Sequence, residues 1–324
     1  MSRSGVGPRR TTAMALGVVA VLALAGCGDD KAEPRQGSRP VGGSASASAS
    51  TGADEGATPD GQTPEIEVLG TGAQPRRVLE LDLVEGHVED GTMRMTVTTS
   101  ADVMSTPPVK VPMVMPVRTT VTDVTGDRAT VESQYGEVSV PRSSGLDEAS
   151  RQQLLESMQL LDGTTIRVVY DRSARTLSSE VEYGDKGGSE VLERMLDDFA
   201  AQSSNLSVLM PEQAVGVGAR WQATSSITVG GITSDVVATY ELTGLADDGY
   251  TVRLTSRQTP RRGPVATGGE IIGGGTDVTG TTEVRHGMVG PFHAIGTGHG
   301  TVTMEVGGQR VRTTFDMTMD VSTR

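Results

Sequence analysis

The chain has 324 residues, with 41 acidic against 28 basic side chains, a single cysteine and only 3 % aromatic residues. A net charge of −13 argues against nucleic acid as a partner, because Lys and Arg must neutralise the phosphates in such complexes. One cysteine excludes a disulfide framework and a multi-cysteine metal site. The 35 % of apolar residues suffice for a buried core, and 42 glycines predict many turns.

The N-terminus has the composition of an export signal. Three arginines within the first ten residues precede an apolar run from Ala13 to Ala25. These 13 residues are too few to cross a bilayer, which needs about 20. The run ends in Leu24, Ala25, Gly26 and Cys27, so the only cysteine directly follows two small residues.

This ending resembles the lipobox of bacterial lipoproteins. The resemblance implies that residues 1–26 are a cleaved signal peptide, that Cys27 is diacylated, and that lipid anchors the protein to the extracytoplasmic face of the cell membrane. Two or three acyl chains anchor a domain stably, because each buried CH₂ contributes about 0.8 kcal/mol. Cleavage removes three arginines and no acid from the net charge of −13, leaving −16. The alternative is a secretory signal with an incidental cysteine.

Residues 27–74 are predicted to form a disordered tether. The segment contains a Gly-Ser-Ala-Ser repeat from Gly43 and scarcely any large apolar side chain before Ile66. Such a chain cannot bury enough surface to offset the entropy of ordering it. Its root-mean-square reach would be about 35–40 Å.

Residues 75–324 are predicted to form one α+β domain that is mainly β. Apolar and polar residues alternate along many segments, most clearly from Val311 to Val321, as in half-buried antiparallel strands. Turn sequences such as Thr125-Gly126-Asp127 separate these runs. We expect about ten strands in one curved, half-barrel-like antiparallel sheet.

Two segments depart from this alternation and predict amphipathic helices. In the first, Ser144 and Asp147 form a capping box before apolar residues at helical spacing, ending at Gly163. The second begins near Ser189 and carries an apolar stripe to Phe199. Each stripe needs an apolar partner, so we expect both helices on the concave face of the sheet.

Parts of the sequence resemble one another, and other parts resemble known bacterial lipoproteins. The hairpins Val117–Val131 and Val237–Leu254 are alike, which leaves open that the domain consists of two pseudo-repeat halves. The segment Leu209–Trp221, with its Val-Gly-x-Gly run, and the hairpin strand Ala238–Leu242 resemble an uncharacterised family of actinobacterial envelope lipoproteins. The layout also looks like the half-barrel of lipoprotein carriers and lipid-carrying lipoproteins, on architecture alone.

The methionine content suggests a ligand. There are 14 methionines against three phenylalanines and one tryptophan, and flexible methionines repack around ligands of varied shape. The hypothesis is an apolar cavity that accepts an acyl chain; the alternative is a filled core in a structural lipoprotein that engages an envelope protein. The candidate lining residues are Met93, Met95, Met113, Met115, Met158, Met195, Phe199, Phe315, Met317 and Met319.

The sequence predicts no catalytic residues, cofactor or metal, and hence a non-enzymatic protein. It contains no Gly-x-Ser-x-Gly elbow and no phosphate-binding Gly-x-x-x-x-Gly-Lys loop. His286, His293 and His299 leave open a metal-assisted hydrolase, although their spacing is wider than in known zinc motifs. Residues 260–280 are rich in glycine and are predicted to be a long loop: a lid over the cavity mouth, a finger that dips into lipid, or an insertion without a role.

Overall fold

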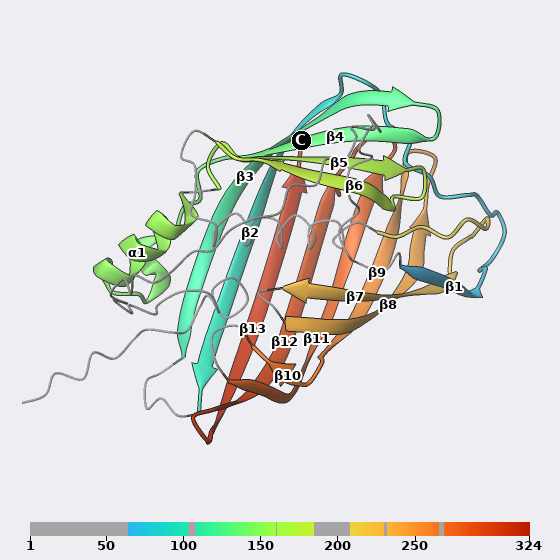
Figure 1. Cartoon of the computed structure of the whole chain (residues 1–324). Coiled ribbons are helices and arrows are strands. Elements are labelled where there is room, and N and C mark those ends of the chain that lie inside the picture. Colours follow the sequence, from blue (N-terminus) through green and yellow to red (C-terminus); the bar gives the residue numbers. More distant parts are fainter. Residues whose placement is uncertain (1–63, 103–107, 160, 185–207, 230–231, 266–268) are drawn as a thin grey trace, which may run out of the picture.

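The computed structural model describes residues 64–102, 108–159, 161–184, 208–229, 232–265 and 269–324 (Figure 1). Most of them belong to one antiparallel sheet of 13 strands. The strands are β1 (Glu65–Gly70), β2 (Val88–Ala101), β3 (Val109–Thr125), β4 (Arg128–Tyr135), β5 (Thr165–Asp171), β6 (Thr176–Glu182), β7 (Arg220–Val229), β8 (Ile232–Leu245), β9 (Gly249–Pro260), β10 (Gly263–Pro264), β11 (Glu270–Arg285), β12 (His293–Val306) and β13 (Gln309–Thr323).

The sheet consists of two meanders joined through the last strand. Its order is β1-β7-β8-β9-β11-β12-β13-β2-β3-β4-β5-β6, with β10 paired to β11. Strands β2–β6 therefore follow one another in space as in sequence, and so do β7–β13. The pairing of β13 with β2 makes them one sheet, which leaves β1 and β6 as its two edges. The predicted curved antiparallel sheet is confirmed.

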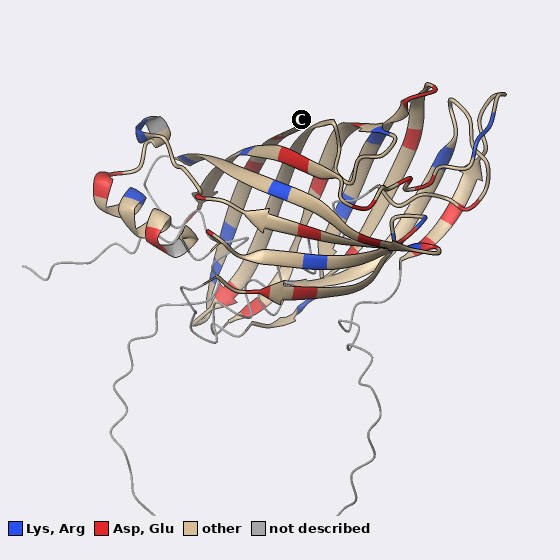
Figure 2. Cartoon of the chain, turned by 90° about the horizontal axis from the view of Figure 1, so that it is seen from above, with Lys and Arg blue, Asp and Glu red and all other residues tan. Residues whose placement is uncertain are grey.

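The two ends of the sheet curl toward each other (Figures 1 and 2). The turn after β5 reaches the segment before β7, where the Met210 N–H donates to the Ser173 carbonyl at 3.2 Å. Arg175 and Glu212 form an ion pair at 3.2 Å beside this contact. Ala174 in the same turn is buried in the apolar cluster of β7–β9. The face that carries this cluster is therefore the concave face.

Trp221 lies at the centre of that cluster. Its side chain is fully buried and stacks on Tyr240, with 5.5 Å between ring centroids. The indole Nε1–H donates to the Leu209 carbonyl at 2.7 Å, so the buried polar group is satisfied. Burial raises the pKa of Tyr240 to about 12, which keeps its phenol neutral at physiological pH.

Close backbone contact explains Gly216, whereas Gly218 has a φ of +83° that favours glycine. A Cβ at Gly216 would lie 1.8 Å from the Ala73 carbonyl oxygen, so only glycine fits. The Ala73 N–H donates to the Val217 carbonyl at 2.9 Å in the same region. The Val-Gly-x-Gly run thus packs residues 71–77 directly against the entry to β7.

One α-helix, α1 (Glu148–Met158), and one short 3₁₀ helix (Arg142–Ser144) occur among the described residues. The cap of α1 is Asp147, whose carboxylate accepts the Ser150 N–H at 2.8 Å, and not Ser144 as predicted. The helix lies beside β3 (Figure 1), and Leu154 packs with Val111 of that strand. It therefore covers only one margin of the concave face. The predicted second helix lies outside the described residues.

Two segments predicted to lack regular structure contain strands. Residues 65–70, predicted as the end of the tether, pair with β7 as β1, since Ile66 and Val68 supply an apolar alternation too short to stand out. Within the predicted loop 260–280, β10 and the first part of β11 are strands. Glycines are tolerated there because β12 pairs with them along one side, while β10 and β9 pair with the residues of β11 just before and just after them. The sheet thus has 13 strands and exceeds the expected ten.

Replacing Trp221 by alanine is expected to lower the free energy of unfolding by about 3–5 kcal/mol, because the change leaves a large cavity and an unpaired Leu209 carbonyl. Urea denaturation followed by circular dichroism measures this. Val237→Ala, on the opposite face of β8 and 38 % exposed, is the control and should cost less than about 0.5 kcal/mol. Equal stability of the two variants would contradict the assigned core.

Candidate functional site

The concave face carries a patch of methionines on three adjacent strands. Met113 of β3 lies opposite Met95 of β2, which lies opposite Met319 of β13. The neighbouring row joins Met115 to Met93 in the same way. Because directly opposed residues point to the same face, these side chains form one surface, which we call the methionine patch. Its members are Met93, Met95, Met113, Met115, Met317 and Met319.

A column of small residues runs along β12 beside the methionine patch. On the concave face the first half of this strand presents Ala294, Gly296, Gly298 and Gly300, and Val302 and Met304 follow on the same face. Gly296 lies between Met319 of β13 and Gly280 of β11. Of the described residues, only the Thr279 carbonyl oxygen comes within 4 Å of a Cβ placed at Gly296. The column therefore forms a trough in the apolar floor, which we call the glycine trough.

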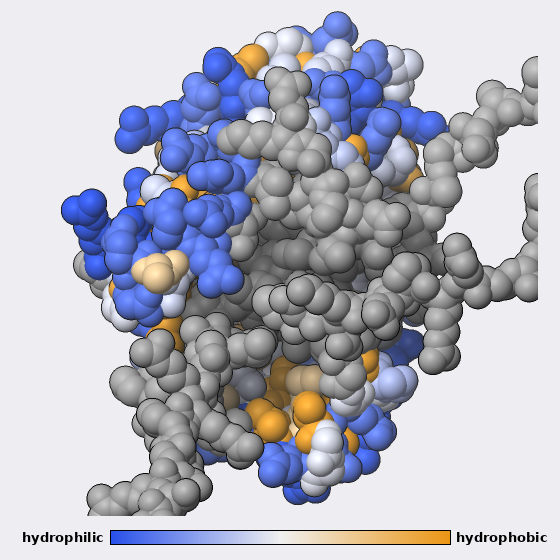
Figure 3. All heavy atoms as spheres, turned by 60° about the vertical axis from the view of Figure 1, so that its left-hand side comes forward, coloured by the Kyte–Doolittle hydropathy of each residue, from blue (hydrophilic) through white to orange (hydrophobic). Residues whose placement is uncertain are grey.

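The other candidate lining residues differ in position. Met158 lies on α1 and packs against the cluster that contains Met113, at the margin of the patch. Phe315 faces the trough from β13, while Met195 and Phe199 lie outside the described residues. Figure 3 shows hydrophobic residues gathered at the lower end of the visible face, between hydrophilic margins.

Part of the trough is filled by its own neighbours. A Cβ at Gly300 would lie 2.3 Å from the ring of Phe315, so this ring occupies the space that the glycine leaves. The Met317 methyl would lie 3.4 Å from a Cβ at Gly298. This filling favours the alternative of a packed core at that end, whereas Gly296 has no described side chain above it.

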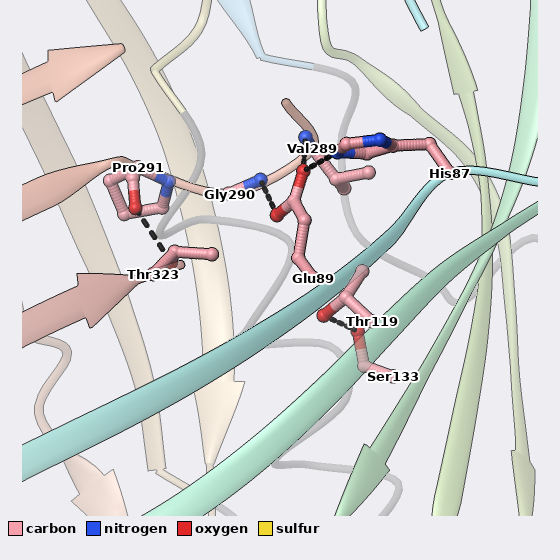
Figure 4. Close-up of polar contacts among 8 residues, drawn as sticks. All are labelled: His87, Glu89, Thr119, Ser133, Val289, Gly290, Pro291 and Thr323. Carbon is pink, nitrogen blue, oxygen red and sulfur yellow. Dashed lines mark hydrogen bonds and ion pairs between the residues drawn. The ribbon is translucent and has the colours of Figure 1, made fainter. Parts of the chain in front are cut away.

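A buried carboxylate lies near the start of β2 (Figure 4). Glu89 is 2 % exposed and accepts the N–H groups of Val289 at 2.7 Å and Gly290 at 3.3 Å. On the last residue of β13, the Thr323 hydroxyl donates to the Pro291 carbonyl at 2.8 Å. These bonds join the turn between β11 and β12 to β2 and β13, so the two meanders are held together by side chains as well as by strand pairing.

His87 is the histidine closest to this carboxylate. Its Nε2 lies 3.2 Å from Glu89 Oε1, and its side chain is 39 % exposed. A protonated imidazole forms an ion pair at this distance. The two N–H donors already engage both carboxylate oxygens, so the arrangement serves to hold a turn. Glu89 is not among the predicted site residues, although it alternates in phase with Met93 and Met95 and is therefore recognisable in the sequence as an acid on an apolar face.

The structure does not bring the three C-terminal histidines together. His286 follows β11, while His293 and His299 lie six residues apart on one face of β12, which corresponds to about 20 Å. His299 Nδ1 contacts Asp316 at 2.7 Å, and His293 lies 3.9 Å from Asp320. Among the described residues, no three His, Cys, Asp or Glu side chains are close enough to hold a metal ion.

The lipobox residues Leu24–Cys27 lie outside the described residues. In the part of the chain that the structure describes, no helix is long and apolar enough to span a membrane.

No protein-family model and no curated protein matches this sequence. Among solved structures, an outer membrane channel from Pseudomonas putida F1 shares 10 % identity over 76 % of this chain and 98 % of its own, with a TM-score of 0.21. OmpT, an outer membrane protein of Vibrio cholerae, shares 9 % identity over 74 % of this chain and 100 % of its own, with a TM-score of 0.20. At such TM-scores these likenesses carry no argument.

Replacing Glu89 by alanine is expected to lower the free energy of unfolding by about 1–3 kcal/mol, because the Val289 and Gly290 N–H groups lose their acceptor. Urea denaturation measures the loss. Glu85→Ala removes an equal charge from an exposed position in the preceding turn and serves as the control. If both variants unfold at the same urea concentration, Glu89 does not hold the turn.

Proposed function

We propose that this protein is a membrane-anchored, extracytoplasmic lipoprotein that binds an acyl chain or another apolar ligand in the glycine trough. The observation that carries the proposal is the methionine patch lying in register beside that trough on a concave sheet face. Binding would be non-enzymatic and would use apolar contact alone.

The methionine patch and the glycine trough both have properties suited to binding an acyl chain. Most of the patch methionines are only partly buried, so a chain lying against them would remove further apolar surface from water. Unbranched, polarisable methionine side chains adjust to chains of different length and saturation. The trough supplies space at Gly296, where the described residues place only backbone within contact distance.

The proposed anchor fits this role. Acylation of Cys27 would hold the domain at the membrane, which contains acyl chains, and the segment between Cys27 and β1 would allow the domain to move above the surface. After cleavage the net charge would be −16, so an anionic membrane surface would repel the domain. Attachment would therefore depend on the acyl chains.

The second candidate is a structural lipoprotein with a filled core that engages an envelope protein. The position of the Phe315 ring over Gly300 favours it, because a side chain of the sheet occupies the trough there. The hollow of about 560 Å³ that the structure does show is lined by none of the patch methionines. The two candidates differ in whether the space at Gly296 accepts a ligand.

Substituting Gly296 by leucine is expected to reduce acyl-chain binding at least about tenfold, because the isobutyl group would occupy the trough. The probe is cis-parinaric acid, a fluorescent fatty acid, titrated into the purified full-length chain. Thr297→Leu, on the opposite face of the same strand, is the control and should bind like the wild type. Absence of binding to the wild type, or equal loss in both variants, would favour the filled core.

Substituting Cys27 by serine is expected to abolish incorporation of a palmitate analogue during growth in a lipoprotein-acylating bacterium, because the hydroxyl does not replace the thiol that carries the diacylglyceryl group. Mass spectrometry of the purified chain measures the label. Gly28→Ser alters the adjacent position, keeps the thiol and should remain labelled. An unlabelled wild type would refute the anchor without bearing on ligand binding.

A further inference from the structure

The face opposite the methionine patch contains a polar hollow of about 560 Å³. It lies where β2, β3 and β13 meet the loop before β5. Side chains alternate between the two faces along a strand, so Arg94 points away from Met93 and Met95. The hollow therefore lies on the convex face and is separate from the proposed acyl-chain site. Its lining includes Asp90, Thr92, Arg94, Arg118, Ser322 and Arg324.

The strand register places these residues in order. Arg324 and Asp90 exchange both backbone hydrogen bonds, and Asp90 lies opposite Arg118 of β3. Arg324, the residue after β13, and Arg118 of β3 thus flank Asp90 of β2 in one row. The next row of the same face contains Ser322 and Thr92, whose hydroxyls line the hollow. Arg94 lines it from two residues further along β2.

The three arginines differ in their neighbours. Arg118 forms a loose ion pair with Asp90, with 3.7 Å between Arg118 Nε and Asp90 Oδ1, and both side chains are more than half exposed. No described residue forms an ion pair with Arg94 or Arg324. Counting side chains alone, three arginines outnumber Asp90 and Asp162 by one in the hollow, and Asp320 lies opposite Arg94 on the neighbouring strand. Arg94 and Arg324 thus keep N–H donors that no ion pair with a described residue engages.

We propose that this hollow binds an organic phosphate. Guanidinium groups recognise phosphate and carboxylate oxygens alike, but a phosphate offers more acceptor oxygens than a carboxylate to three arginines that line one hollow. The volume falls in the range of about 300–1,000 Å³ that is typical of small-molecule sites, so there is room for an organic group beside the phosphate. The phosphate belongs to a lipid headgroup or to a soluble ester, and the test separates these sources.

The test is calorimetric titration of the full-length chain with two soluble probes. Glycerol 3-phosphate represents a soluble ester, and glycerophosphoglycerol represents a lipid headgroup. We expect the double variant Arg118→Gln/Arg324→Gln to weaken binding at least about tenfold, because each lost guanidinium removes charge-assisted hydrogen bonds. The control Arg257→Gln/Arg312→Gln removes the same charge outside the hollow and should bind within about twofold of the wild type.

The outcomes are distinct. Tighter binding of glycerophosphoglycerol assigns the hollow to a headgroup, and tighter or equal binding of glycerol 3-phosphate assigns it to a soluble ester. Binding of neither probe to the wild type, or equal weakening in the control variant, overturns the proposal. A negative result for phosphate binding does not bear on the proposed acyl-chain site, because that site lies on the other face of the sheet.

A measurement on the unaltered protein guards against misfolding of the variant. Phenylglyoxal modifies accessible arginines, and the proposal predicts that the tighter-binding probe protects Arg94, Arg118 and Arg324 from it. Arg257 and Arg312 should react equally with and without the probe. Peptide mass spectrometry reads each position separately, and lack of protection at the three hollow arginines contradicts the assignment.

Discussion

The pairing of β13 with β2 is the contact on which the rest of this structure depends. It joins strands from opposite ends of the domain, more than 200 residues apart, and so combines two local meanders into one sheet. Closing so long a loop costs entropy that purely local hairpins avoid. The hydrogen bonds of Glu89 and Thr323 to the turn before β12 help to offset this cost at the same junction.

Both proposed sites lie across this junction. On the concave face, β13 brings Met317 and Met319 beside the methionines of β2 and β3. On the convex face, backbone hydrogen bonds that continue this pairing place Arg324 next to Asp90, which lies opposite Arg118. Because side chains alternate along each strand, the same junction carries an apolar surface on one face and an arginine-lined hollow on the other.

Local patterns predicted much of the sheet, and the errors have identifiable causes. Alternation located most strands, and Asp147 was rightly placed at the start of α1, although its partner Ser144 proved to belong to a 3₁₀ helix. The first part of β11 was mistaken for a loop because Gly273, Gly274 and Gly275 carry no side chains from which alternation can be recognised. Their strand conformation comes from pairing with residues 301–303 of β12, which lie well outside the range of a local pattern.

The sequence alone determined that the fold is mainly β, that its strands alternate between apolar and polar residues, and that one face is rich in methionine. These properties depend on residues close together in the chain. The lipobox resemblance of Cys27 also rests on the sequence alone. Only the tertiary structure decided that the methionines of three strands share one row, that Glu89 is buried, and that Arg324 meets Arg118 across Asp90. Strand order and register are set by long-range packing and hydrogen bonding, which no local pattern encodes.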